Sequence, residues 1–295
     1  MPQYELKYGN ATAVVNSFGG ELASYVAANG RQYIWPGDPD VWKSHGPILF
    51  PVVGTVINEK ISIDGKTYSI PKHGLVRKRE FTLGRHGKDF VEYTLSSNEE
   101  LLEKYPFQFT LHITHSIGEM GFTTEYMVEN QSDKRMPMCI GGHPGFCCPI
   151  YDGEKFEDYV LKFECTEHSQ NMLAPNGGCI TGSEWLKEFT DTDTLHLDHS
   201  LFDPRDALIF SDLKSRKVKL INPATNKGLE FDFEKFDALG IWTAPNKNAP
   251  YVCLEPWCGL PAIEGETGNF EDKPFVRFVE PGESFRISYS MKVID

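Results

Sequence analysis

Short stretches in which apolar and polar residues alternate occur along most of the chain. In the clearest, Phe107, Phe109, Leu111 and Ile113 are separated by polar residues, the period-two pattern of a strand buried on one face. Residues 60–70 alternate around Asp64-Gly65, a preferred pair for a tight hairpin turn. Further strands are predicted at residues 11–15, 32–35, 81–83, 90–95, 207–210, 217–221, 228–233, 238–242, 252–255 and 285–293. His112 and His115 are interpreted as strand or surface residues.

Helical patterns are scarce by comparison. Residues 98–105 are predicted to be helical, because Ser97 with Glu100 forms a capping-box pattern and Pro106 ends the segment. A second short helix is predicted around residues 183–189. Many short strands and few helices predict an all-β fold, a large antiparallel β-sandwich of two sheets. We expect one domain over residues 1–295.

Composition and charge narrow the class of protein. The 295 residues are 40% hydrophobic and 24% charged, as in ordinary globular proteins, and the net charge of −13 argues against a nucleic-acid partner. A phosphorylated small molecule would need only one basic spot, and Lys72 with Arg77 is a candidate. No signal-peptide pattern and no apolar run of about 20 residues is found, so no membrane partner is expected. Seven cysteines without paired spacing predict a reduced, cytoplasmic protein. The sequence leaves open whether it is a monomer or a homodimer.

A histidine at position 143 follows Gly141-Gly142 and precedes Pro144-Gly145. Proline disfavours helix for the residue before it, so His143 is expected at the end of a strand, with its imidazole held in one direction. Imidazole exchanges protons near neutral pH, since its ordinary pKa is roughly 6.5. A loop histidine capping a turn is the alternative interpretation. In two other stretches, residues 71–77 with His73 and residues 253–257 with Glu255, an ionisable side chain likewise stands next to glycine or proline.

Glu255 is the acidic residue of the last of these stretches. It follows the apolar residues 251–254, at the predicted end of a strand, and precedes Pro256-Trp257. A carboxylate among apolar residues must be paired, hydrogen-bonded or functional, because burial of an unpaired charge is costly. Trp257, with Trp242 or Phe146, could offer a flat apolar face to a sugar ring. Core packing of these aromatic residues is the alternative.

Taken together, the stretches around His73, His143 and Glu255 resemble, in order and separation, the aldose 1-epimerase (galactose mutarotase-like) family. Trp42, residues 48–51 and the Asp64-Gly65 hairpin resemble its bacterial mutarotase-like branch. The resemblance extends from about Gly19 to Met291. It implies an antiparallel β-sandwich whose concave face binds a hexose or a hexose phosphate, with no metal and no cofactor.

The resemblance also implies roles for individual residues. Glu255 corresponds to the general base, His143 to the general acid and His73 to a histidine that hydrogen-bonds the sugar. Asp206, or otherwise Asp203, would bind ring hydroxyls. One position departs from the family pattern: Thr55 stands where relatives commonly have arginine, and Arg77 is a possible substitute.

The implied activity is that of an isomerase, an aldose 1-epimerase that interconverts the α- and β-anomers of a hexose. Opening the ring requires a base at the anomeric hydroxyl and an acid at the ring oxygen, and we expect the two groups on opposite sides of the sugar.

Three alternatives stay open at this point. The first is a hexose-6-phosphate mutarotase in which Lys72 and Arg77 bind the phosphate. The second is a non-catalytic carbohydrate-binding or regulatory protein on the same fold. The third is a metal isomerase in which His73, His143 and Glu255 form a two-histidine, one-carboxylate site.

Overall fold

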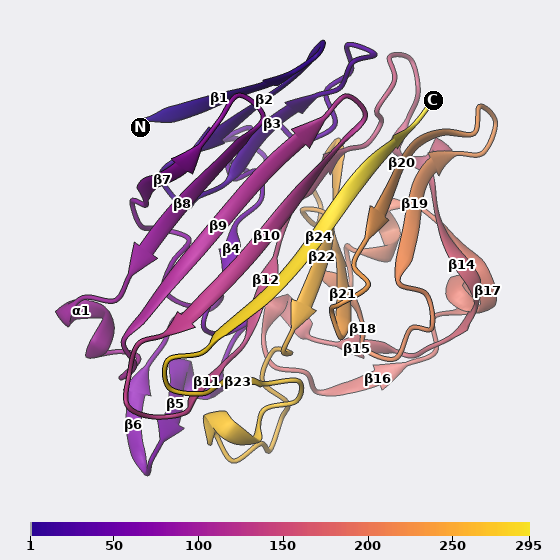
Figure 1. Ribbon diagram of the computed structural model, residues 1–295. Helices are drawn as coiled ribbons and strands as arrows, with labels where there is room; N and C mark the ends of the chain where they lie inside the picture. The colour runs from indigo at the N-terminus through magenta and orange to yellow at the C-terminus, as the bar shows by residue number, and fades with distance from the viewer. Residues whose placement is uncertain (1) are drawn as a thin grey trace.

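Two antiparallel sheets, one stacked behind the other, form most of the structure (Figure 1), a computed structural model that describes residues 2–295. The larger sheet has nine strands, and half of its neighbouring pairs are also consecutive in the chain. In spatial order they are β17 (Thr190–His196), β14 (Val160–His168), β19 (Lys217–Asn222), β20 (Lys227–Asp232), β24 (Ser284–Ile294), β10 (Gly121–Asn130), β9 (Phe109–Gly118), β8 (Phe90–Ser96) and β7 (Thr82–His86).

The smaller sheet has six strands and lies behind the large one in Figure 1. In spatial order they are β18 (Ala207–Phe210), β21 (Ala238–Trp242), β22 (Tyr251–Cys258), β12 (Ile140–Gly142) and β4 (Ile48–Leu49), with β13 (Gly145–Cys147) also paired to β22. Two consecutive short strands, β12 and β13, therefore share one long partner, and the break between them falls at His143 and Pro144.

The remaining elements are short and peripheral. The other strands are β1 (Gln3–Tyr8), β2 (Ala11–Asn16), β3 (Leu22–Val26), β5 (Lys60–Ile63), β6 (Lys66–Ser69), β11 (Met136–Met138), β15 (Asn171–Leu173), β16 (Gly182–Glu184) and β23 (Arg277–Val279). The helices are α1 (Glu99–Leu102) and the 3-10 turns η1 (Ile57–Glu59), η2 (Phe156–Asp158), η3 (Pro175–Gly177), η4 (Lys187–Phe189), η5 (His199–Leu201) and η6 (Phe270–Asp272). The prediction of an all-β sandwich with few short helices is confirmed.

Most predicted strands are also confirmed. The alternating residues after Phe107 lie in β9, where every second side chain is buried. Asp64 and Gly65 both have positive φ, as the turn between β5 and β6 requires. Residues 32–35 are an exception, because they form isolated bridges to Val26 and Phe146 and no strand.

Both helix predictions need correction. The only α-helix in residues 2–295 is α1, and its cap is Asn98, whose side chain accepts a hydrogen bond from Leu101 N. Ser97 was predicted as the cap, but its hydroxyl accepts from Phe109 N, so it ties the segment to the neighbouring strand. Residues 183–189 lie partly in strand β16 and partly in the 3-10 turn η4. Residues 182–184 instead pair with β15, so tertiary pairing outweighed the local helical preference there.

Strand β22 is longer than predicted, and this changes the place of Glu255. The strand runs to Cys258, so Glu255 lies in its middle and not at its end. Pro256 is tolerated because Leu254 N donates to Pro144 O (3.2 Å) and alternation puts the nitrogen of Pro256 on the same edge of the strand. There Pro256 lies opposite Gly142, so its missing N–H falls at the last residue of the short strand β12.

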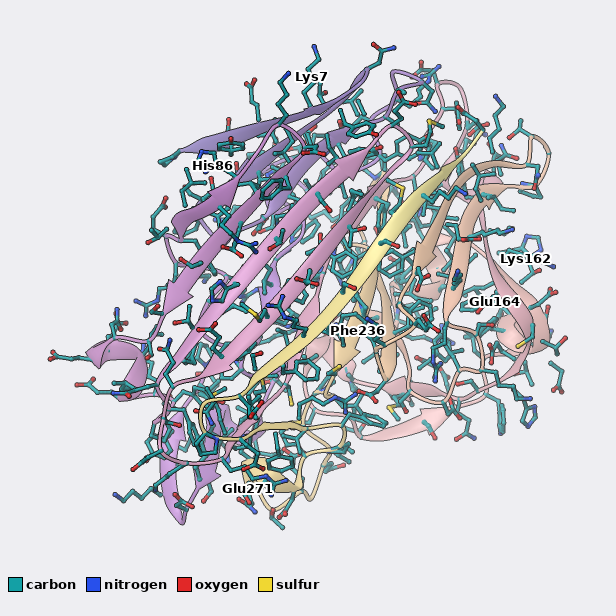
Figure 2. The ribbon with its side chains drawn as sticks, in the orientation of Figure 1. Lys7, His86, Lys162, Glu164, Phe236 and Glu271 are labelled. Atoms are coloured by element: carbon teal, nitrogen blue, oxygen red, sulfur yellow. The ribbon has the colours of Figure 1, made fainter. Side chains whose placement is uncertain are left out.

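The two sheets pack closely at β12. A Cβ atom on Gly142 would lie 2.8 Å from the Tyr289 ring and 2.9 Å from the Tyr126 hydroxyl, both on the large sheet. A glycine is therefore required at position 142 because the two sheets approach each other closely there, and not because the backbone has a positive φ. In Figure 2, Phe236 lies near the centre of the view, whereas Lys7, His86 and Lys162 lie toward its edges. In residues 2–295, no helix is long and apolar enough to cross a membrane.

His115 was predicted to be a strand or surface residue, and it lies on β9 but is buried between the sheets. Its Nε2 lies 2.8 Å from Gly20 O, and since a carbonyl only accepts, Nε2 carries the hydrogen. Its Nδ1 accepts from the Thr124 hydroxyl at 2.9 Å. Burial lowers the pKa of His115 to about 4, so the ring is neutral at pH 7.

This burial predicts a loss of stability in mild acid. The unfolded chain takes up a proton on His115 below about pH 6.5, whereas the folded chain does so only near pH 4. The free energy of unfolding should therefore fall by about 3 kcal/mol between these pH values through this residue. Urea unfolding at pH 7, 5.5 and 4 measures the slope, which should be smaller in His115→Gln. An identical slope in both proteins would contradict the assignment.

Candidate active site

A cavity of about 310 Å³ lies over the smaller sheet, on the face turned away from the large sheet. Side chains from β22 alternate between the two faces, so Glu255 and Trp257 both point to this side. All six residues predicted for the site line the cavity: Glu255, His143, His73, Asp206, Arg77 and Trp257. They come from four separate parts of the chain.

His143 and Glu255 are in direct contact. Their Nε2 and Oε1 atoms lie 3.2 Å apart, and both side chains are largely buried. Gly141 pairs with Trp257 and Gly145 with Cys253, so His143, midway between the glycines, falls opposite Glu255. Residues directly opposite each other on one face of a sheet have neighbouring side chains. The prediction that the two groups lie on opposite sides of a sugar is therefore wrong: they share one wall of the cavity.

Burial favours the uncharged form of both His143 and Glu255. It raises the pKa of Glu255 well above its ordinary value, a rise that the Lys72 charge partly offsets. It lowers the pKa of His143 to about 3, with Lys72 and Arg77 contributing in the same direction. Both shifts favour the uncharged forms, a carboxylic acid next to a neutral imidazole. The pair then holds one proton, the same number as a carboxylate next to an imidazolium.

His73 is held by hydrogen bonds to one glycine. Its backbone N donates to Gly54 O (2.7 Å), and Gly54 N donates to its ring Nδ1 (3.2 Å). The other ring nitrogen, Nε2, therefore carries the hydrogen and can donate to a ligand. Burial lowers the pKa of His73, which keeps the ring neutral. The next residue, Gly74, must be glycine, because a Cβ atom there would lie 2.0 Å from Phe50 O.

Of the two candidate aspartates, only Asp206 lines the cavity. The indole nitrogen of Trp242 donates to its Oδ1 at 3.2 Å, which fixes the direction of the carboxylate. Asp203 accepts a hydrogen bond from Asn246 N at 2.7 Å on the exposed surface. Asp203 therefore holds a loop, and Asp206 is the aspartate available to a ligand.

Trp257 lines the cavity, and its ring lies along the smaller sheet. Its ring lies against the neighbouring strands, since a Cβ atom on Gly240 would be 2.6 Å from Cζ2 and one on Gly141 would be 2.8 Å from Cδ1. Its Nε1 is buried next to the Glu255 carboxyl group and lowers the pKa of that group, so Trp257 supports the pair from the cavity wall. Phe146 packs between the sheets against Phe122 and Phe231.

Two cations complete the lining. Lys72 and Arg77 both contribute to the cavity wall, and neither forms an ion pair within residues 2–295. Thr55 is not among the lining residues, and its carbonyl accepts from Ala262 N. Arg77 is thus the arginine that faces the cavity. Within residues 2–295, no group of three or more His, Cys, Asp or Glu side chains is arranged to hold a metal ion.

The sequence interpretation assigned no site role to Trp42. Its ring lines the cavity together with Trp242, and the two indoles meet edge to face with centroids 5.4 Å apart. A lone tryptophan in a loop, 101 residues before His143, carries no local signal of this contact. Hydrogen bonds of Gly145 with Trp35 and His45, on either side of Trp42, bring the two segments together.

This fold and this cavity define a class of protein: the chain belongs to the aldose 1-epimerase family. The sequence model of the family described as aldose 1-epimerase matches residues 2–292. Two LacX proteins of Lactococcus lactis subsp. lactis, plasmid and chromosomal, are each 36% identical over 298 residues, 99% of both chains.

Solved structures agree with this assignment. A galactose mutarotase related enzyme from Lactobacillus acidophilus superimposes with a TM-score of 0.90 and 28% identity, covering 100% of this chain and 98% of its own. A galactose mutarotase-like protein from Lactobacillus casei gives a TM-score of 0.91 and 28% identity, covering 99% of this chain and 100% of its own.

Proposed function

We propose that the protein is a mutarotase that interconverts the α- and β-anomers of a hexose at this cavity. The contact between His143 and Glu255 is the observation that carries the proposal. It supplies a proton donor and a proton acceptor 3.2 Å apart on the wall of a cavity of about 310 Å³. His73 and Asp206 add a donor and an acceptor for sugar hydroxyls around it.

A compact pair suits the reaction. The anomeric oxygen and the ring oxygen are bonded to the same carbon, C1, so adjacent catalytic groups can reach both. In ring opening, one member of the pair takes the proton of the anomeric hydroxyl while the other gives its proton to the ring oxygen. The bond from C1 to the ring oxygen breaks and the C1 carbonyl forms. The pair again holds one proton, now on the other member.

Reclosure completes the exchange of anomers. Rotation about the C1–C2 bond presents the other face of the aldehyde, and the same two proton transfers run in reverse. In the family role, Glu255 is the base and His143 the acid, and His73 donates a hydrogen bond to the sugar. Because the pair carries one proton in every state, it needs no outside proton for turnover.

Polarimetry of freshly dissolved α-glucose and α-galactose tests the proposal. We expect the protein to accelerate the approach to anomeric equilibrium well beyond the spontaneous rate. Tight sugar binding without any acceleration would instead identify a carbohydrate-binding protein on the same fold.

A second candidate is a mutarotase of hexose 6-phosphates. The observation in its favour is that Lys72 and Arg77 face the cavity without ion-pair partners in the described residues, although the chain has a net charge of −13. Unpaired, partly buried cations favour an anionic ligand.

Replacing Arg77 distinguishes the two candidates. Under the second proposal we expect Arg77→Met to lower kcat/KM about tenfold more for hexose 6-phosphate than for the free hexose, through loss of a charged hydrogen bond. Arg79→Met is the matched control, since the Arg79 guanidinium is bound to Glu100 at 2.5 Å and does not line the cavity. Equal losses on both sugars would leave the free hexose as the substrate.

A further inference from the structure

The indole of Trp42 lies against the imidazole of His143. The ring centroids are 5.2 Å apart and the ring planes are inclined by 32°. The same indole stacks on Tyr251, with centroids 5.2 Å apart and planes inclined by 25°. A Cβ atom on Gly145 would lie 2.9 Å from Trp42 Cζ3, so the glycine two residues after His143 leaves room for this ring.

The loop that carries Trp42 is held by the protein itself. The indole nitrogen of Trp35 donates to Trp42 O at 2.8 Å, and Asp38 N donates to the same oxygen at 3.0 Å. Trp242 meets the Trp42 ring edge to face at 5.4 Å. The position of Trp42 next to His143 is therefore built into the fold.

The charges around His143 show what this contact can do. Glu255 on β22 is the carboxylate in contact with the ring, and His73 lies 5.9 Å away, centroid to centroid. Lys72 and Arg77, from the segment of His73, both oppose a positive charge on His143. The face of an indole carries negative electrostatic potential and attracts a cation within about 6 Å.

We propose that Trp42 is a positioning residue for the proposed reaction: it holds the His143 imidazole against Glu255 and stabilises the imidazolium that forms while His143 carries the proton. The inference rests on the proposed function and deepens it. In the step concerned, the proton moves between His143 Nε2 and a sugar oxygen, and Trp42 itself gains and loses nothing.

Two variants test the proposal. Trp42→Leu keeps an apolar side chain but removes the aromatic face, and we expect kcat to fall about tenfold, equal to about 1.4 kcal/mol, with KM changed by less than about twofold. The alkaline limb of the kcat–pH profile should move to lower pH by up to about one unit, because the imidazolium loses stabilisation. Trp42→Phe keeps an aromatic face and should restore most of kcat and the position of the limb.

The control is Trp185→Leu, the same substitution at an exposed tryptophan whose ring lies 4.4 Å from that of His168, outside the cavity. Its kinetics should match the wild type. A Trp42→Leu enzyme with raised KM and unchanged kcat would overturn the inference, because Trp42 would then serve only as a surface for the sugar. A Trp42→Phe enzyme as impaired as Trp42→Leu, or an unmoved alkaline limb, would also overturn it. Wild-type protein that fails to accelerate mutarotation would instead reject the proposed function.

Discussion

Replacing Glu255 by glutamine is expected to lower the rate of mutarotation by a factor of about 10²–10⁴, the usual contribution of a general acid or base. Glutamine keeps the shape of the side chain and can still hydrogen-bond His143 Nε2. It cannot exchange a proton, so the pair can no longer accept one while it donates another. His143→Asn should cause a comparable loss for the same reason. Polarimetry on the wild type and both variants measures the effect.

Folding should survive the Glu255→Gln substitution. Burial raises the pKa of Glu255, so the fold already favours its uncharged form, and glutamine is uncharged as well. We expect the Tm to change by less than about 4 °C. The control is Glu230→Gln, on β20 of the large sheet and away from the cavity lining, which should retain full activity. Near-normal rates in both pair variants would reject the assignment of His143 and Glu255.

Replacing Asp206 by asparagine should give the second large effect, a loss of about 10- to 100-fold in kcat/KM. A hydrogen bond from a sugar hydroxyl to a carboxylate contributes about 1.5–3 kcal/mol more than no bond, and the amide accepts more weakly. Asparagine is the suitable replacement because Asp206 has a φ of 69°, a left-handed conformation that asparagine adopts readily. The loss should appear chiefly in KM if Asp206 binds substrate and transition state equally.

Asp203→Asn is the matched control for this experiment. The side chain lies three residues earlier in the same turn, but its carboxylate accepts from Asn246 N, and an amide oxygen can accept the same bond. Kinetics equal to the wild type are expected. If Asp203→Asn impaired the enzyme more than Asp206→Asn, the choice between the two aspartates would be reversed.

The sequence interpretation succeeded where a signal was local. Short apolar runs predicted β18 and β21 with the correct bounds. Alternation predicted β9, because a half-buried strand needs side chains of opposite character on its two faces, although the strand extends further, to Gly118. It failed at Ser97, where a capping pattern was present but the hydroxyl bonded to the neighbouring strand. It also ended β22 too early at Pro256, because the end of β12 that faces the proline lies more than 100 residues away.

Some features of the candidate site could likewise be predicted from the sequence, whereas others became visible only in the structure. Glycine and proline neighbours marked the segments of His143, Glu255 and His73, and the resemblance of these motifs to the family selected the three residues. The motifs could not reveal that Trp42 lies against His143, or that the ring of Trp257 lies over glycines of adjacent strands. These contacts join segments that no spacing rule relates.

By itself, the sequence determined that this protein is an all-β sandwich of the aldose 1-epimerase family and which side chains can exchange protons in it. Only the tertiary structure decided that the imidazole of His143 and the carboxyl group of Glu255 touch on one wall of the cavity. The physical reason is strand register. Hydrogen bonds between β22 and its two short partners set His143 opposite Glu255, and a shift of one residue would turn one of the two side chains to the other face of the sheet.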